Sequence, residues 1–312
     1  MNSVKLTLFI AGLAMTVNCV AENPTDTQCT NASVRAGLPS PTVRGAEKPR
    51  IESHWKGKKV AFLGDSISDP RNLGRRKFYW EYLAFTLGVD AHVYARSGAR
   101  MDRMLTYAKD VKKDLDGHAD ALFVFAGTND YNGGVPLGRW YDEAEEDTVR
   151  NGKKVRLVRR SFSMDENTFR GRINRLMDYL RRNFPEQQIV MMTALHRGYA
   201  KFSDRNVQPD ESFPNALGLH IDDYNQAIRE AGRIWSVPVL DLHERCGLFP
   251  LFSEHSCYFM DVNKDMLHPN DAGHARIAET MARWMLALPS DFKGLLSFPL
   301  RMKELENSHL FR

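Results

Sequence analysis

Residues 60–68 read VAFLGDSIS, and this stretch decides the fold class. Its first part, 60–63, is apolar and has the character of a buried strand. Gly64, Asp65 and Ser66 follow without an intervening loop. A buried strand that ends on an acid and a hydroxyl indicates that these polar groups have a role at that position. We therefore expect Ser66 to be exposed in the turn that follows the first strand of a sheet.

Along the rest of the chain, apolar runs of strand length alternate with segments of helical period. The predicted strands are 59–63, 91–95, 121–126, 188–194 and 237–242. The predicted helices are 78–87, 101–115, 165–183, 221–235 and 271–288. Nearly continuous apolar strands indicate a parallel sheet with both faces covered by helices. The predicted fold class is therefore α/β, a three-layer α/β/α sandwich around a central, mostly parallel, five-stranded sheet.

The chain is long enough for a full core, and its charge is nearly balanced. It has 312 residues, 43% of them hydrophobic, which suits one α/β domain better than two small ones. With 43 basic and 39 acidic residues the net charge is +4, too slight an excess to indicate nucleic-acid binding. The densest basic cluster, 169–182, has apolar residues at helical spacing, so its arginines are expected on the solvated face of a helix. We expect no nucleic-acid partner, and the oligomeric state is left open.

The N-terminus has the layout of a secretory signal peptide, residues 1–21. Lys5 precedes an apolar run at 6–17, and small residues then lead to a predicted cleavage site after Ala21. The apolar run is too short to cross a bilayer as a helix, which needs about 20 residues. We therefore expect an exported protein, periplasmic or secreted, without integral membrane association. Lipid attachment at Cys19 is a less favoured alternative, because its preceding residues suit it poorly.

The predicted organisation after the signal peptide has three parts. Residues 22–55 are rich in Asn, Thr, Ser and Pro and are expected to form an N-terminal arm. Residues 56–288 form the α/β domain, and 289–312 form a C-terminal tail. Within the domain, the polar segment 131–163 interrupts the strand–helix alternation. A long insertion in a compact domain is usually a lid or a binding loop.

Three cysteines remain after removal of the signal peptide: Cys29, Cys246 and Cys257. Export permits disulfides, and Cys246 and Cys257 close a short loop, so a bridge between them is predicted with Cys29 left over. Three free thiols are the alternative. The cysteines lack zinc spacing, and four further histidines also lack metal-ligand spacing: His220, His243, His255 and His274. No metal and no cofactor are predicted.

Polar residues follow several of the predicted strands. Ser66 follows the first strand, Gly98 the second and Asn129 the third, while Asp265 and His268 precede the last helix. In open α/β sheets, ligands bind outside the carboxyl ends of the strands. These five residues are therefore expected to converge at one edge of the sheet.

The five residues supply what acyl transfer requires. A serine needs a base to accept its proton, and His268 is available for that role. Asp265, three residues earlier, is close enough to hold the other imidazole nitrogen. The tetrahedral intermediate needs hydrogen-bond donors for its oxyanion, which the backbone N–H groups of Ser66 and Gly98 and the amide of Asn129 can provide.

Four blocks carrying these residues resemble the signature blocks of the SGNH/GDSL hydrolase superfamily. They are GDSIS at 64–68, the glycine of SGAR at 97–100, GTND at 127–130 and DMLHP at 265–269. The resemblance spans about residues 58–288 and implies a flavodoxin-like SGNH hydrolase fold. It also implies a serine esterase that forms an acyl-enzyme and uses no metal or organic cofactor. The sequence does not fit the G-x-S-x-G motif of the ordinary α/β-hydrolases, because position 68 is serine.

Within this family, exported members often remove acetyl groups from polysaccharides. The expected partner is therefore a small-molecule or polysaccharide ester, with a short acyl group on a carbohydrate preferred. A lipase, thioesterase or acyltransferase of the same fold remains open. A scaffold that binds glycan without turnover is the alternative from another class of protein.

Each candidate residue also has a purely structural interpretation. Asp65 or Ser66 could cap a helix, Asn129 could shape a turn, and Asp265 with His268 could cap the last helix. Five residues beside the predicted site are weaker candidates for substrate contact, since surface turns show the same pattern: Asp65, Arg100, Asp130, Tyr131 and His196. Of these, Asp65 is expected chiefly to order the turn by hydrogen bonding.

Overall fold

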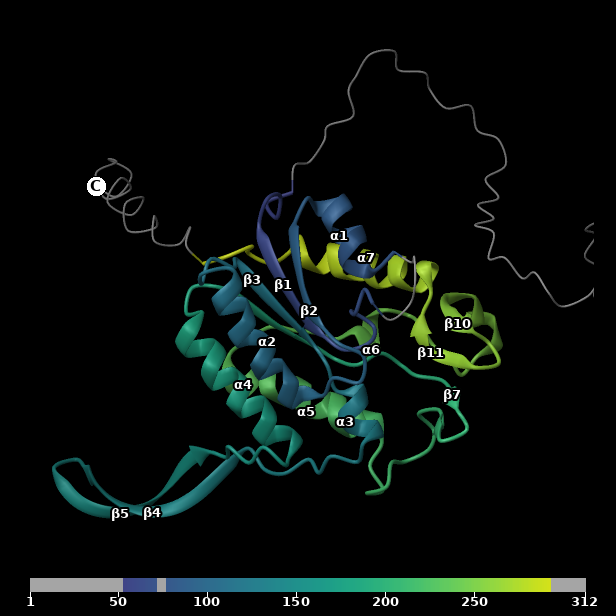
Figure 1. The fold of residues 1–312 in the computed structure, drawn as a ribbon. Helices are drawn as coiled ribbons and strands as arrows, with labels where there is room; N and C mark the ends of the chain where they lie inside the picture. The colour runs from purple at the N-terminus through teal and green to yellow at the C-terminus, as the bar shows by residue number, and fades with distance from the viewer. Residues whose placement is uncertain (1–52, 72–76, 293–312) are drawn as a thin grey trace, which may run out of the picture. The chain divides into compact units, whose positions relative to one another are not determined.

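The computed structural model describes residues 53–71 and 77–292, all within one compact unit of the chain (Figure 1). The predicted signal peptide at 1–21, nearly all of the arm at 22–55 and most of the tail at 289–312 lie outside the described residues. The predictions about those segments therefore remain predictions.

Five parallel strands form the central sheet. They are β1 (Lys59–Gly64), β2 (Asp90–Ala95), β3 (Ala121–Phe125), β6 (Gln188–Met192) and β9 (Val239–Leu240). Their order across the sheet is β2-β1-β3-β6-β9, and every neighbouring pair runs parallel. When these five strands are numbered consecutively along the chain, their order across the sheet is 2-1-3-4-5, which is the flavodoxin-like arrangement. The predicted fold class is confirmed, and the order reverses direction between β1 and β3.

Helices cover both faces of this sheet. They are α1 (Tyr79–Leu87), α2 (Met101–Asp114), α4 (Phe169–Asn183), α5 (Ile221–Trp235) and α7 (Asp271–Met285). Helices α1 and α7 lie on one face, and α2, α4 and α5 lie on the other (Figure 1). Among the residues that the structure describes, no helix combines the length and apolar character that a membrane span requires.

Burial on both faces of the sheet explains why β1 is apolar throughout. Val60 and Phe62 point into the core under α1 and α7, whereas Ala61 and Leu63 point into the core under α2, α4 and α5. All four side chains are fully buried. A strand buried on both faces cannot alternate apolar and polar residues, so its first polar side chains come only after it ends.

Several short elements stand beside the main sheet. Four strands form a second, antiparallel sheet in the order β10-β11-β7-β8: β7 (Ala200–Ser203), β8 (Asn206–Gln208), β10 (Phe259–Asp261) and β11 (Asp265–Pro269). The structure also has three short helices: α3 (Thr128–Asn132), α6 (Leu242–Arg245) and a 3₁₀ helix (Ser253–Tyr258). The pairing of β7 with β11 joins Ala200 to Asp265, one of the predicted catalytic residues.

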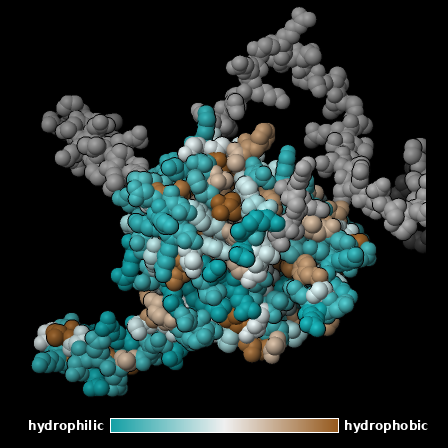
Figure 2. Space-filling view, viewed as in Figure 1, coloured by the Kyte–Doolittle hydropathy of each residue, from teal (hydrophilic) through white to brown (hydrophobic). Residues whose placement is uncertain are grey.

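The predicted insertion at 131–163 contains a long β-hairpin. Strands β4 (Tyr141–Arg150) and β5 (Lys153–Phe162) pair over their whole length and extend away from the helices (Figure 1). At the base, the Phe162 ring stacks on Trp235 of α5 with centroids 4.1 Å apart. Beyond the base, the surface of the hairpin is mostly hydrophilic (Figure 2), and acidic side chains of β4 pair with arginines of β5.

The predicted disulfide between Cys246 and Cys257 is wrong. Cys246 is a free thiol, 2% exposed, that packs in the core beneath α7. Burial raises the pKa of this thiol to about 12, so it stays protonated and unreactive. Cys257, in the 3₁₀ helix, is disulfide-bonded, but to a cysteine other than Cys246.

Candidate active site

Ser66, His268 and Asp265 lie together at the carboxyl edge of the central sheet. Ser66 Oγ is 2.8 Å from His268 Nε2. On the other side of the imidazole ring, His268 Nδ1 is 2.8 Å from Asp265 Oδ2. The three side chains therefore form one chain of hydrogen bonds, with the acid and the base carried by β11. This is the geometry by which a carboxylate orients a histidine and the histidine activates a serine.

The turn after β1 fixes the direction of the Ser66 side chain. A Cβ atom on Gly64 would lie 2.3 Å from Ser68 Oγ, so only glycine fits at that position. Asp65 Oδ1 accepts a hydrogen bond of 3.0 Å from the N–H of Ile67. One feature differs from the sequence prediction: Ser66 is only 5% exposed, because the side chain of His268 lies directly against it.

Asp265 holds both the backbone and the ring of His268 in place. Its Oδ1 accepts hydrogen bonds from the N–H groups of Leu267 and His268, at 3.2 and 3.0 Å. The alternative that Asp265 and His268 cap the last helix is wrong. That role belongs to Asn270, whose Oδ1 accepts hydrogen bonds from the first N–H groups of α7.

The candidate oxyanion donors Ser66, Gly98 and Asn129 follow β1, β2 and β3, the strands at the reversal of strand order. Gly98 adopts a φ of +77°, a conformation that favours glycine. Within residues 53–71 and 77–292, neither the N–H of Ser66 nor that of Gly98 donates to an acceptor. The Asn129 amide donates to Ala99 O at 3.0 Å and to Asp65 Oδ2 at 3.3 Å. Donation by Asn129 to an oxyanion therefore requires release of the longer bond, to Asp65.

Asp65 is the acid next to the candidate nucleophile, and it is 3% exposed. Burial raises the pKa of its carboxyl to about 6, against the lowering effect of the hydrogen bond from Ile67 and of nearby His268. The charge beside Ser66 is therefore sensitive to pH near 6. Its contacts agree with the prediction that Asp65 orders the turn.

Two residues predicted to touch substrate have structural partners instead. Asp130 is fully buried, with one carboxylate oxygen accepting from the N–H of Met101 and the other from Arg172, both at 2.8 Å. It thereby holds the start of α2. Tyr131 is 4% exposed, and its hydroxyl donates to Phe213 O at 2.6 Å. Their position next to Asn129 in sequence does not bring them to a surface that substrate can reach.

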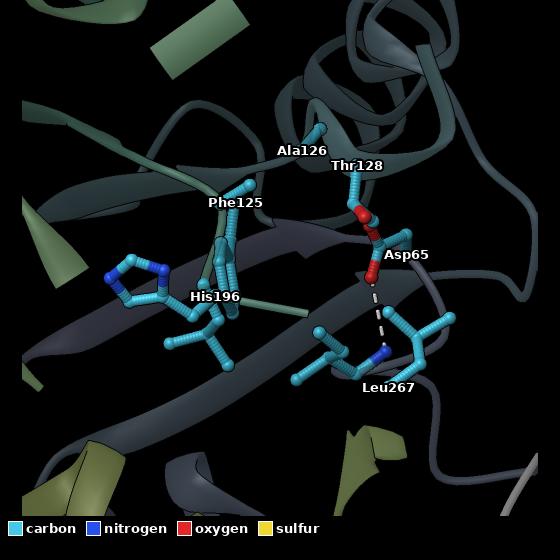
Figure 3. Close-up of a pocket in the computed structure, with 9 residues that line it drawn as sticks. Asp65, Phe125, Ala126, Thr128, His196 and Leu267 are labelled. Carbon is cyan, nitrogen blue, oxygen red and sulfur yellow. Dashed lines mark hydrogen bonds between the residues drawn. The ribbon is translucent and has the colours of Figure 1, made fainter. Parts of the chain in front are cut away.

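Arg100 and His196, the other two candidates, have different surroundings. Arg100 is exposed and lines an open groove with Gly98, Arg96 and Arg103, so it is placed to meet a ligand. His196 lines a small cavity near Asp65, but its ring is turned away from Asp65 (Figure 3). The cavity has a volume of about 10 Å³, room for one water molecule.

Sequence analysis missed one residue that contacts the site. Phe202 of β7 packs against the His268 ring, with centroids 5.4 Å apart, and is 45% exposed. No local pattern marks Phe202, because its position depends on the pairing of β7 with β11. Its exposed face offers an apolar contact beside the Ser66–His268 pair.

Comparison with known proteins shows which family and which solved structures this chain resembles. The sequence matches the model of the GDSL-like Lipase/Acylhydrolase family over residues 62–276. Among solved structures, a protein from Lactobacillus plantarum is 27% identical with a TM-score of 0.57, covering 74% of this chain and 98% of that one. A search of curated proteins found no match.

Two more distant solved structures are similar in fold. A possible lipase from Chitinophaga pinensis is 19% identical with a TM-score of 0.50, covering 73% of this chain and 97% of that one. The salicylyl-acyltransferase SsfX3 from a tetracycline biosynthetic pathway is 17% identical with a TM-score of 0.52. The match covers 75% of this chain and 56% of that one.

Proposed function

The chain belongs to the GDSL-like lipase/acylhydrolase family, and we propose that it is an exported serine esterase with Ser66 as nucleophile. The observation that carries this proposal is the 2.8 Å contact between Ser66 Oγ and His268 Nε2. It joins a hydroxyl to a base that Asp265 orients from its other nitrogen. A serine needs such a base to attack an ester at neutral pH.

The proposed reaction has two halves. In the first, Ser66 Oγ bonds to the ester carbonyl carbon while His268 Nε2 takes the hydroxyl proton, and Asp265 stabilises the imidazolium. The N–H groups of Ser66 and Gly98, with the Asn129 amide, bind the oxyanion. The intermediate collapses to an acyl-enzyme, and His268 returns its proton to the leaving alcohol. In the second half, His268 Nε2 takes a proton from water as the water oxygen bonds to the acyl carbon. The bond between that carbon and Ser66 Oγ then breaks, His268 returns the proton to Oγ, and the acid leaves.

The proposed substrate is a short acyl ester, acetyl above all, on a carbohydrate. The groove beside Gly98 carries the exposed, hydrogen-bonding side chains of Arg96, Ser97 and Arg100, which suit a hydroxyl-rich alcohol. The cavity next to Asp65 has about 10 Å³, so a long acyl chain does not fit there.

Fluorophosphonate labelling followed by an ester panel tests this function. The protein should be labelled on Ser66 and should hydrolyse p-nitrophenyl acetate faster than the palmitate ester, and then deacetylate an acetylated polysaccharide. A glycan-binding scaffold without turnover would show neither labelling nor hydrolysis. An acyltransferase would move the acyl group to an added alcohol in preference to water.

Asn129→Ala is expected to lower kcat by about 10²–10³-fold with little change in KM, the usual cost of one lost oxyanion donor. The matched control is Asn167→Ala, since Asn167 is exposed and bonds only to nearby Asp165. Steady-state kinetics and melting temperatures should be measured for both variants. A normal kcat with a lowered melting temperature for Asn129→Ala would show that this amide is structural.

The mature chain is expected to begin near Glu22 and to be found outside the cytoplasm. The basis is the sequence at Lys5 and the apolar run 6–17. N-terminal sequencing of protein recovered from the exported fraction measures this. An intact Met1 on protein confined to the cytoplasm would contradict it.

A further inference from the structure

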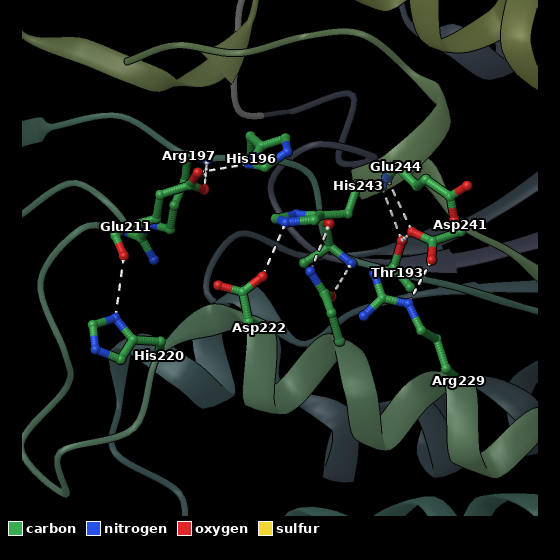
Figure 4. Close-up of polar contacts among 12 residues, drawn as sticks. Thr193, His196, Arg197, Glu211, His220, Asp222, Arg229, Asp241, His243 and Glu244 are labelled. Atoms are coloured by element: carbon green, nitrogen blue, oxygen red, sulfur yellow. Dashed lines mark hydrogen bonds and ion pairs between the residues drawn. The ribbon is translucent and has the colours of Figure 1, made fainter.

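Two histidines and a glutamate from separate segments meet beyond the end of β6. His196 comes shortly after β6, Glu211 lies between β8 and α5, and His243 lies on α6. One potential ligand atom from each residue lies within 4.8 Å of the other two. The side chains are 18%, 9% and 9% exposed, respectively, so the cluster is largely withdrawn from solvent. Figure 4 shows the three side chains with their polar contacts.

His243 has a buried nitrogen that lacks a partner. Its Nε2 is 3.3 Å from Asp222 Oδ1, whereas its Nδ1 is buried and forms no hydrogen bond within the described part of the chain. Buried polar atoms are nearly always paired, because an unpaired one costs free energy. A carboxylate beside one ring nitrogen also favours a lone pair on the other, as in histidines that bind metals.

The other two residues of the cluster contact each other. His196 Nδ1 is 2.6 Å from Glu211 Oε1, and the N–H of Arg197 donates to Glu211 Oε2 at 2.8 Å. The rings of His196 and His243 lie with their centroids 3.5 Å apart. Two imidazoles this close repel each other if both are protonated, whereas two neutral rings can each direct a nitrogen lone pair, which lies in the plane of the ring, to one cation at the edge of the pair.

We propose that His196, Glu211 and His243 bind a divalent transition metal ion, and that Zn²⁺ is the ion they fit best. Two imidazoles and one carboxylate form a known zinc ligand set, with water or a fourth side chain completing the tetrahedron. At Zn–N distances of about 2.0–2.1 Å, tetrahedral ligand atoms lie about 3.3 Å apart. The ligand atoms of the cluster lie within 4.8 Å of one another, so side-chain rotations that shorten these distances would bring them to that geometry.

The ion would connect three segments near the candidate active site without touching the reacting atoms. His196 lies four residues before β7, and β7 pairs with β11, which carries Asp265 and His268. Bound Zn²⁺ would therefore stabilise the surroundings of the triad as a structural ion. This inference does not depend on the esterase proposal.

Zn²⁺ binding to untagged, chelator-treated protein tests the proposal. Equilibrium dialysis followed by elemental analysis should give one Zn²⁺ per chain, and the melting temperature should rise with added Zn²⁺. His243→Ala should weaken binding by about 100-fold or more and abolish that rise. His118→Ala is the matched control, since His118 is exposed and outside the cluster, and it should behave as wild type.

Glu211→Gln covers the case in which His243→Ala fails to fold. It keeps the shape of the side chain and removes its charge, so it should also lose tight Zn²⁺ binding. The proposal is overturned if the wild-type protein binds no Zn²⁺ at equimolar concentration. It is equally overturned if the folded cluster variants bind Zn²⁺ as tightly as wild type.

Discussion

Ser66→Ala is expected to lower kcat by about 10⁶-fold, the cost of losing the nucleophile in a triad enzyme. Without the hydroxyl, no acyl-enzyme forms, and fluorophosphonate has no oxygen to label. The matched control is Ser68→Ala, because the Ser68 hydroxyl bonds to Tyr79 and not to His268. That control should lose some stability and keep most of its kcat. If Ser66→Ala retains most wild-type activity on the best ester found, Ser66 is not the nucleophile.

His268→Ala should be about as severe, and the double variant Ser66→Ala/His268→Ala scarcely worse than either single one. If the two side chains act as one unit across their 2.8 Å contact, as proposed, the second replacement removes nothing that still works. Losses that multiply in the double variant would mean that the two residues act independently. The kinetics of the three variants, measured on one ester, decide between these outcomes.

Asp265→Asn is expected to lower kcat by about 10⁴-fold while the fold is retained. The asparagine oxygen can still accept the hydrogen bonds that Asp265 Oδ1 receives from the backbone of Leu267 and His268. The NH₂ group, however, replaces the oxygen 2.8 Å from His268 Nδ1. It favours the tautomer protonated on Nε2, which cannot accept the proton of Ser66.

Kinetics and thermal unfolding of Asp265→Asn should be compared with those of Asp261→Asn. Asp261 is exposed on neighbouring β10, and its carboxylate accepts from the N–H of Asn263. That control should be nearly normal in both measurements. A kcat for Asp265→Asn within about tenfold of wild type would show that the acid does not set the tautomer of His268.

The central sheet could be predicted from sequence because burial on both faces leaves a simple signal. Strands such as β1 and β3 are continuous apolar runs, and each is followed within a few residues by polar groups. The outer element β9 has only two residues, Val239 and Leu240, and its predicted range of 237–242 was too long. Short edge strands end where hydrogen bonding stops, which hydrophobicity alone does not reveal.

The β4–β5 hairpin was not predicted because its exposed strands carry cross-strand charge pairs and lack an apolar face. A signal was nevertheless present. Asn151-Gly152 has positive φ at both residues, 52° and 73°, and Asn-Gly is the strongest short hairpin-turn signal. The charged residues that flank it lack the apolar alternation that predicts a strand.

The candidate triad could be predicted because each residue belongs to a local block next to a strand or helix. Adjacency alone was misleading for Asp130 and Tyr131, since one turn of α3 directs them into the protein. The cluster around His196 and His243 has no local signature at all. Its residues are 15 or more positions apart in sequence and meet only in the folded protein.

The hydrogen bond between Ser66 and His268 spans 202 positions of the chain, which affects when activity can first appear. A growing polypeptide carries Ser66 early, but it lacks the base until nearly the whole domain has left the ribosome. Loop-closure entropy rises only by about 0.6 kcal/mol per doubling of length, so this separation adds little to the cost of folding. If Ser66 and His268 act as proposed, incomplete chains that end before β11 are inert, and hydrolysis begins only once synthesis of the domain is nearly complete.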